Sequence, residues 1–438
     1  MNTPRLARAA LLLSGIAATP LMAADSPEGF LEGSRLQLNQ RNFYFHRNLL
    51  NNPGGQNYRE EWAHGFTLDY QSGYTQGTVG FGFGLDAYAN LGLKLDSNRA
   101  RTGTDLLPID SRGRPEDSQA EIGGALKLRV SRTELKYGSQ APMNPVFGTG
   151  NARLFAPMPI GFSLGSREVE NLLLEAGHFT AGNDGNSTNR DGALKALFAQ
   201  VETRRADYLG GQWTPSDATH LSAYASRYED IWRQYYLGAG QRLDLADQQS
   251  LTLDASFYRT LDQGRSLAGR IDTTAWSASA RYRFGAHALT LAHQRVNGDQ
   301  PFDYLGFDRQ PGTSIYLANS VQVLDFNAPN ERSWQVRYDL DFAPFGVPGL
   351  SFMSRYIRGD HIDDSHRSSP SAYQRYGEAG KRWERDIELG YVVQDGSAKD
   401  LSIRLRQASI RSTAQVGRAD TADNNELRVI IDYPLQLL

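Results

Sequence analysis

Apolar and polar residues alternate along most of the chain, in stretches of about ten residues separated by clusters of glycine, asparagine, aspartate and proline. Apolar side chains occupy every second position in residues 126–130, 276–284, 334–342, 401–405 and 427–433. The intervening positions are mostly charged or small and polar. A period of two is that of a β-strand with one apolar and one polar face. Helical periodicity is nearly absent, so the pattern predicts an all-β protein.

A soluble β-sandwich would show the same alternation, so the pattern alone does not fix the class of protein. The number and length of the segments favour a membrane barrel. Roughly 18 segments follow one another, at about 23 residues for each strand and its connection, and membrane-spanning strands need about 9 to 11 residues. We therefore predict a transmembrane antiparallel β-barrel of about 18 strands. Aromatic clusters at residues 43–45 and 232–236 are expected to form girdles at the membrane surface.

The beginning of the chain has the features of a cleaved export signal. Two arginines precede an apolar stretch over residues 9–18, and the small residues Ala23 and Ala24 follow. We expect a signal peptide over residues 1–24 and one outer-membrane barrel domain over residues 25–438, in a Gram-negative cell. No run of about 18 apolar residues exists, which excludes a helical membrane protein.

The amino-acid composition excludes several kinds of site and partner. The chain has no cysteine, which excludes disulfides, thiolate metal sites and cysteine nucleophiles. Its formal net charge of -3 does not suit a nucleic-acid-binding protein. The positive charge is carried by 40 Arg and only 6 Lys. Guanidinium groups stay ionised and bind carboxylates in a bidentate manner, so this bias indicates contact with carboxylates.

The connections between the alternating segments differ in length. Residues 284–287 are a tight turn, whereas residues 97–118, 138–167, 297–314 and 359–382 are long. Outer-membrane barrels have short turns on the periplasmic side and longer loops outside. We expect the long loops to carry the functional features, including loops folded inward to form a constriction.

Eight short strings are more specific than the alternation. They are RNFYF (41–45), SGYTQGTVG (72–80), LGLKLD (91–96), EAGHFT (175–180), DIWRQYYL (230–237), GDQPFDY (298–304), LANSVQ (317–322) and IDYPL (431–435). Together they resemble the OprD family of substrate-specific outer-membrane porins, from about residue 29 to 438. The resemblance implies an 18-stranded barrel, monomeric or loosely trimeric. It also implies facilitated diffusion of small carboxylate-bearing nutrients, either amino acids or aromatic and cyclic carboxylates.

The resemblance also implies a constriction made by inward-folded loops. The match over residues 142–155 puts Arg153 at the narrowest point of the pore. Asp303 and Tyr304 would face Arg153 across the constriction, as its acidic and hydroxyl side.

A row of basic residues follows from the alternation itself. If the apolar residues face lipid, the residues between them face the interior, and the opposite register would cost about 2–4 kcal/mol for each charge at the membrane midplane. The residues placed inside in this way are Arg41, Lys127, Arg129, Arg281, Arg283, Arg337, Arg404, Arg406 and Arg428. Along a narrow lumen they would offer successive weak sites for a carboxylate. Each arginine could instead brace the wall through an inward Asp or Glu, such as Asp339 or Glu426.

Two other functions stay open. The first is a general, weakly anion-selective diffusion porin, and the second is an outer-membrane hydrolase. The chain has no Gly-x-Ser-x-Gly elbow, and its histidines are scattered. His361 and His366 lie among aspartates, but a solvated loop explains them better than a metal site does. We expect small carboxylates, outer-membrane lipid, lipopolysaccharide and the barrel-assembly machinery as partners, with no nucleic acid, cofactor or metal.

Overall fold

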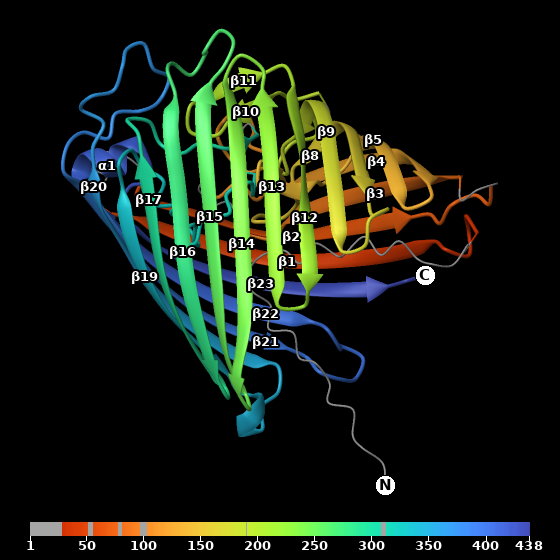
Figure 1. The fold of residues 1–438 in the computed structure, drawn as a ribbon. Helices are drawn as coiled ribbons and strands as arrows, with labels where there is room; N and C mark the ends of the chain where they lie inside the picture. Colours follow the sequence, from red (N-terminus) through yellow and green to blue (C-terminus); the bar gives the residue numbers. More distant parts are fainter. Residues whose placement is uncertain (1–28, 51–55, 78–80, 97–102, 190, 308–311) are drawn as a thin grey trace.

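The wall of the protein is a closed antiparallel β-barrel of eighteen strands, as the sequence predicts (Figure 1). The structure is a computed structural model, and it describes residues 29–50, 56–77, 81–96, 103–189, 191–307 and 312–438. The expected signal peptide, residues 1–24, lies outside these residues. No helix of the described residues is long and apolar enough to cross a membrane.

Each wall strand pairs with the next, and the last pairs with the first. The strands are β1 (Arg35–Leu49), β2 (Tyr58–Gln71), β3 (Gly82–Lys94), β4 (Ser118–Val130), β5 (Thr133–Ser139), β8 (Met158–Ser166), β9 (Leu172–Asn183), β12 (Ala206–Ser216), β13 (Thr219–Tyr228), β14 (Trp232–Ala246), β15 (Gln249–Asp262), β16 (Asp272–Phe284), β17 (His287–Asn297), β19 (Arg332–Asp341), β20 (Leu350–Ile362), β21 (Gly380–Val392), β22 (Ser402–Ser412) and β23 (Asn424–Gln436). The barrel closes between β1 and β23, where Arg41 lies opposite Asp432.

Short elements lie in the connections between wall strands. They are β6 (Met143–Asn144), β7 (Phe147–Gly148), β10 (Leu194–Ala196), β11 (Val201–Thr203), β18 (Leu305–Gly306), a 3-10 turn at Ala343–Phe345 and α1 (Ala414–Ala419). β10 joins β11 to β18, so the connections after β9 and β17 form a small sheet of their own.

The predicted faces of the strands are confirmed by exposure. Trp334, Val336 and Leu126 are 64%, 55% and 65% exposed on the outside of the wall, whereas Gln335 and Lys127 beside them are buried. In a membrane barrel the exposed apolar face is the one that contacts lipid.

The expected aromatic girdles are partly wrong. Phe43, Phe45, Trp232 and Tyr236 are buried inside the barrel, and Tyr235 is exposed outside. Because side chains alternate along a strand, consecutive aromatic residues cannot all face the membrane. Two of the three aromatic residues in each cluster therefore belong to the interior.

The two ends of the barrel differ, as the connection lengths predict. Two-residue turns at 131–132, 217–218, 247–248 and 285–286 close one end. The first wall strand, β1, begins at that end, and the last, β23, ends there, because Gln37 of β1 lies opposite Gln436 of β23. The long connections lie at the other end (Figure 1).

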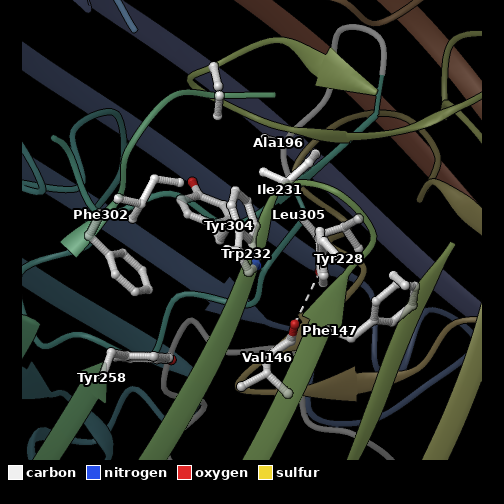
Figure 2. Close-up of a cluster of buried hydrophobic side chains, with 14 of the residues drawn as sticks. Val146, Phe147, Ala196, Tyr228, Ile231, Trp232, Tyr258, Phe302, Tyr304 and Leu305 are labelled. Atoms are coloured by element: carbon white, nitrogen blue, oxygen red, sulfur yellow. Dashed lines mark hydrogen bonds between the residues drawn. The ribbon is translucent and has the colours of Figure 1, made fainter. Parts of the chain in front are cut away.

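The long connections fold into the barrel and pack on its inner wall. The largest buried apolar cluster combines loop side chains with inward aromatic residues of the wall (Figure 2). From the loops come Phe147, Leu194 and Phe302, and from the wall come Tyr228 and Tyr258. This cluster fixes the path of the loops across the barrel interior, which is where the candidate site lies.

Candidate functional site

The connection between β5 and β8, residues 140–157, is pinned to the wall by Phe147. The Phe147 ring is fully buried, 4.6 Å from the ring of Phe179 and 5.6 Å from that of Tyr208. The Tyr228 hydroxyl donates to the Val146 carbonyl at 3.1 Å (Figure 2). These aromatic residues belong to β9, β12 and β13, so this part of the loop is held against one side of the barrel.

The second half of the same loop packs on a different part of the wall. Leu154 and Phe155 join a buried cluster with Phe45 of β1. A Cβ atom at Gly65 would lie 2.9 Å from Leu154 Cγ and 3.0 Å from a Phe155 ring carbon, so this close approach requires glycine. Arg41 holds the loop backbone by donating to the Arg153 carbonyl at 2.7 Å. The loop therefore runs through the barrel interior from β9–β13 to β1–β2.

Arg153 meets the basic wall at this point. Three guanidinium groups surround the Phe45 ring, with centroid distances of 4.5 Å for Arg428, 5.3 Å for Arg47 and 5.4 Å for Arg153. Glu426 pairs with two of them, at 2.5 Å from Arg428 and 2.9 Å from Arg47. Burial lowers the pKa of Arg153, whereas Asp105 raises it and the nearby Arg47 lowers it. Guanidinium stays charged despite such shifts, so three permanent positive charges meet around Phe45.

Asp303 and Tyr304 lie elsewhere than expected. The Asp303 carboxylate accepts backbone N–H groups of Phe198 at 2.9 Å and Ala199 at 3.1 Å, and it is buried in the loop cluster. The Tyr304 hydroxyl donates to Asp325 at 2.7 Å. Burial raises the pKa of Asp303 to about 6. In this structure the pair ties the connections after β9 and β17 together and does not face Arg153, because loop amides occupy the carboxylate.

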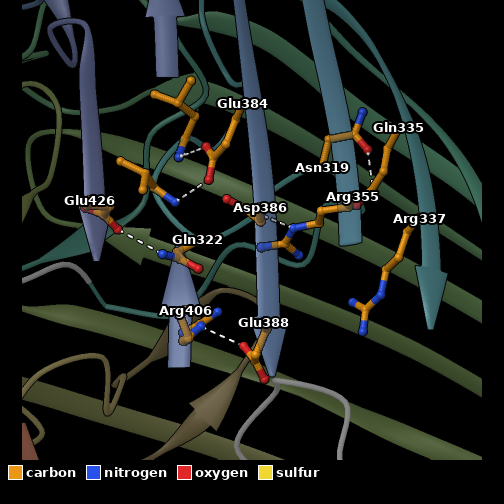
Figure 3. Close-up of polar contacts among 12 residues, drawn as sticks. Asn319, Gln322, Gln335, Arg337, Arg355, Glu384, Asp386, Glu388, Arg406 and Glu426 are labelled. Atoms are coloured by element: carbon orange, nitrogen blue, oxygen red, sulfur yellow. Dashed lines mark hydrogen bonds and ion pairs between the residues drawn. The ribbon is translucent and has the colours of Figure 1, made fainter. Parts of the chain in front are cut away.

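The inward arginines near the closure of the barrel share carboxylates. Asp432 accepts from Arg41 at 2.6 Å and from Arg404 at 2.8 Å. Arg406 pairs with Glu388 at 2.7 Å (Figure 3). Arg406 lies directly opposite Arg428 in the pairing of β22 with β23. Like charges in register repel one another, so this wall has a positive potential that its own acids offset only in part.

The remaining predicted basic residues occupy two further regions of the inner face. On β16 and β19, Arg337 and Arg281 share Asp339 at 2.6 Å and 3.6 Å, and Arg283 lies at the turn end. On β4, Lys127 pairs with Asp86 at 2.7 Å, and the Arg129 guanidinium lies 4.2 Å from the centroid of the Tyr74 ring.

Three inward residues were not among the predicted site residues. Arg355 on β20 pairs with Asp386 on β21 at 2.6 Å, and Glu384 accepts backbone N–H groups of Val323 and Leu324 at 3.0 Å and 2.8 Å (Figure 3). Arg355 and Asp386 lie in alternating segments, so the pattern that placed the other arginines inside the barrel could have placed these two residues there as well. The contacts of Glu384 could not be predicted from the pattern, since its partners lie about sixty residues away in the chain.

Comparison with known proteins identifies the family. The family model described as "outer membrane porin, OprD family" matches residues 28–437. The protein belongs to the OprD family. It is 48% identical to Porin D of Pseudomonas aeruginosa over 418 residues, which are 94% of this chain and 93% of that protein.

Solved structures agree with this assignment. The crystal structure of Pseudomonas aeruginosa OprD has a TM-score of 0.82 and 45% identity, covering 94% of this chain and 98% of that one. Pseudomonas aeruginosa OpdK, solved with vanillate, has a TM-score of 0.83 and 34% identity, covering 93% and 100%. The relatives are porins, so this OprD-family protein is a substrate-specific channel of the Gram-negative outer membrane and not an enzyme.

Proposed function

We propose that the channel carries small carboxylates by passive, facilitated diffusion along its inward arginines. The observation that supports this most directly is the sharing of carboxylates. Asp432, Glu426 and Asp339 each contact two arginines. A pair of guanidinium groups around one carboxylate leaves donors for a second anion, because each guanidinium has five N–H groups.

The proposed path begins at the cluster around Phe45, where Arg153 meets Arg428. From there the wall continues to Arg406, in register with Arg428, and then to Arg404. Arg404 and Arg406 are two residues apart, which separates them by about 6.6 Å along the strand. A carboxylate can therefore contact the next arginine before it leaves the previous one.

The wall acids keep each site weak. A substrate carboxylate at Arg404 competes with Asp432 at 2.8 Å, and one at Arg406 competes with Glu388 at 2.7 Å. Transport by diffusion requires binding that is favourable enough for entry and weak enough for release. The solved complex of the related OpdK with vanillate, which is an aromatic carboxylate, supports this substrate class.

The experiment is a flux measurement with matched solutes. The protein in liposomes is given benzoate, pyroglutamate or arginine, together with benzamide as a neutral match for benzoate. We expect saturable benzoate flux that exceeds benzamide flux, and at least about a tenfold smaller preference in R404Q/R406Q, since charge-assisted hydrogen bonds contribute about 1.5–3 kcal/mol. The variant R112Q/R114Q removes the same charge from an exposed loop and should behave as wild type.

Unsaturable fluxes that follow solute size alone would contradict the proposal and indicate a general, weakly anion-selective porin. Saturable benzoate flux that R404Q/R406Q leaves unchanged would reduce these two arginines to residues that brace the wall.

A further inference from the structure

A second group of arginines lies on the outside of the barrel. Near the loop ends of five successive strands, Arg295, Arg332, Arg358, Arg385 and Arg411 occupy positions on the same strand faces as lipid-facing residues. The outward residues next to them include Trp334, which is 64% exposed, and Tyr356, which is 44% exposed. These arginines therefore do not belong to the interior described above.

The strand register concentrates this charge. Arg295 of β17 lies directly opposite Arg332 of β19, and Arg358 of β20 lies opposite Trp334 on one side and Trp383 on the other. Like charges in register destabilise a sheet unless a counter-charge is near.

Little counter-charge is present in the protein itself. Asp360 lies 3.6 Å from Arg332, and His361 also contacts that guanidinium. Arg295 donates to Asn297, a neutral amide. Arg358 makes no hydrogen bond or ion pair with any residue that the structure describes. Arg411, by contrast, donates to the Asn424 carbonyl at 3.0 Å and to the Asn425 side chain at 3.1 Å. The guanidinium donors left for a ligand on the outer leaflet are therefore those of Arg295, Arg332 and Arg358.

An apolar groove begins beside these arginines. It has a volume of about 600 Å³ and is lined on the outer face by small residues, including Ala255, Ala278 and Ala280. At its loop end stand His293 and Trp334, whose rings lie 4.1 Å apart. The charged patch follows directly, because Arg295 is two residues beyond His293, or about 7 Å along the strand.

We propose that this face binds lipopolysaccharide, with lipid phosphates on Arg295, Arg332 and Arg358 and an acyl chain in the groove. The loop end of an outer-membrane barrel faces outward, where the outer leaflet presents a phosphorylated glycolipid. A guanidinium group is opposite in charge to a phosphate and can donate two parallel hydrogen bonds to its oxygens. Tryptophan, which flanks these arginines, is enriched at membrane interfaces. The groove supplies the apolar half of the same ligand, so the arginines and the groove point to one occupant.

The experiment measures binding of purified lipid A to the full-length protein in detergent, without divalent cations. Arg295→Gln, Arg332→Gln and Arg358→Gln together should weaken binding about 100-fold, since each basic residue near anionic lipid contributes about fivefold. The matched control replaces Arg205, Arg259 and Arg265 by Gln. These side chains also lie near the loop end, but each has a carboxylate partner, which is Glu229 at 3.3 Å, Asp272 at 2.5 Å and Asp230 at 2.7 Å, respectively.

Three further outcomes decide the proposal without relying on one variant. Wild-type protein should bind dephosphorylated lipid A and phosphatidylglycerol more weakly than lipid A, and Ala278→Trp should weaken lipid A binding by filling the groove. Equal loss in the control triple variant, or equal binding of phosphatidylglycerol, would overturn the proposal in favour of unspecific attraction. Carboxylate flux should be the same in the triple variant as in wild type, so failure here is distinguishable from failure of the proposed transport function.

Discussion

Removing the Phe147 ring should release the loop that crosses the barrel interior. The ring is fully buried against Phe179 and Tyr208, and it holds the first half of the loop over residues 140–157 on the side of β9–β13. Phe147→Ala leaves the strand pairing of the wall unchanged. It therefore tests whether the apolar cluster, and not the barrel alone, sets the width of the pore.

The size of the effect follows from the burial. Truncating a buried phenylalanine to alanine costs about 3–5 kcal/mol. The remaining contacts on this side include hydrogen bonds of 3.1 Å from Tyr228 and Tyr258 to loop carbonyls, each contributing about 1 kcal/mol. Since 1.4 kcal/mol is a factor of ten, the ratio of released to packed loop should rise by about 100- to 4000-fold.

The assay is single-channel conductance in a planar bilayer. Wild type should give small, steady steps, and Phe147→Ala should give larger or rapidly fluctuating ones. The control is Phe162→Ala, which removes the same ring from the lipid-facing side of β8, where Phe162 is 46% exposed. If both variants keep the conductance and noise of wild type, the reasoning that places the loop in the conducting path is refuted.

Three further predictions concern the wall and the loops. Arg382→Met leaves the buried Glu331, which now pairs with Arg382 at 2.7 Å, without its counter-charge. It should lower the free energy of unfolding in urea by about 3–5 kcal/mol, and adding Glu331→Gln should restore part of that loss. Val336→Arg should lower it by about 2–4 kcal/mol because Val336 faces lipid, whereas the inward Ser279→Arg, opposite Asp254, should have a much smaller effect; equal losses would contradict the assigned faces. Because the pKa of Asp303 is raised to about 6, its contribution to loop stability is present below about pH 4 and lost as the pH rises through 6, so conductance noise should increase over that range in wild type and not in Asp303→Asn.

The wall could be predicted from the sequence because strand alternation is local. The positions of Trp334 and Val336 outside, and of Arg337 inside, follow from a period of two together with the cost of charge in lipid. Connection lengths likewise identified which end of the barrel carries the loops.

The loop interior could not be predicted in the same way. Asp303 lies in a segment without periodicity, and its partners, the amides of Phe198 and Ala199, are more than one hundred residues away. Alternation also shows which face a residue is on but not which carboxylate it meets, so the sharing of Asp432 by Arg41 and Arg404 appears only once the barrel is closed. The export signal, the loose trimer and the assembly machinery stay predictions.

The most direct test of the arginine-lined channel is the zero-current potential between two concentrations of sodium benzoate. We predict that wild type gives the sign of an anion-selective pore, because Arg153 and Arg428 meet at the loop crossing. The variant R153Q/R428Q should move the potential toward zero or to the opposite sign. A wild-type pore without anion preference, or a variant with an unchanged potential, would contradict the account.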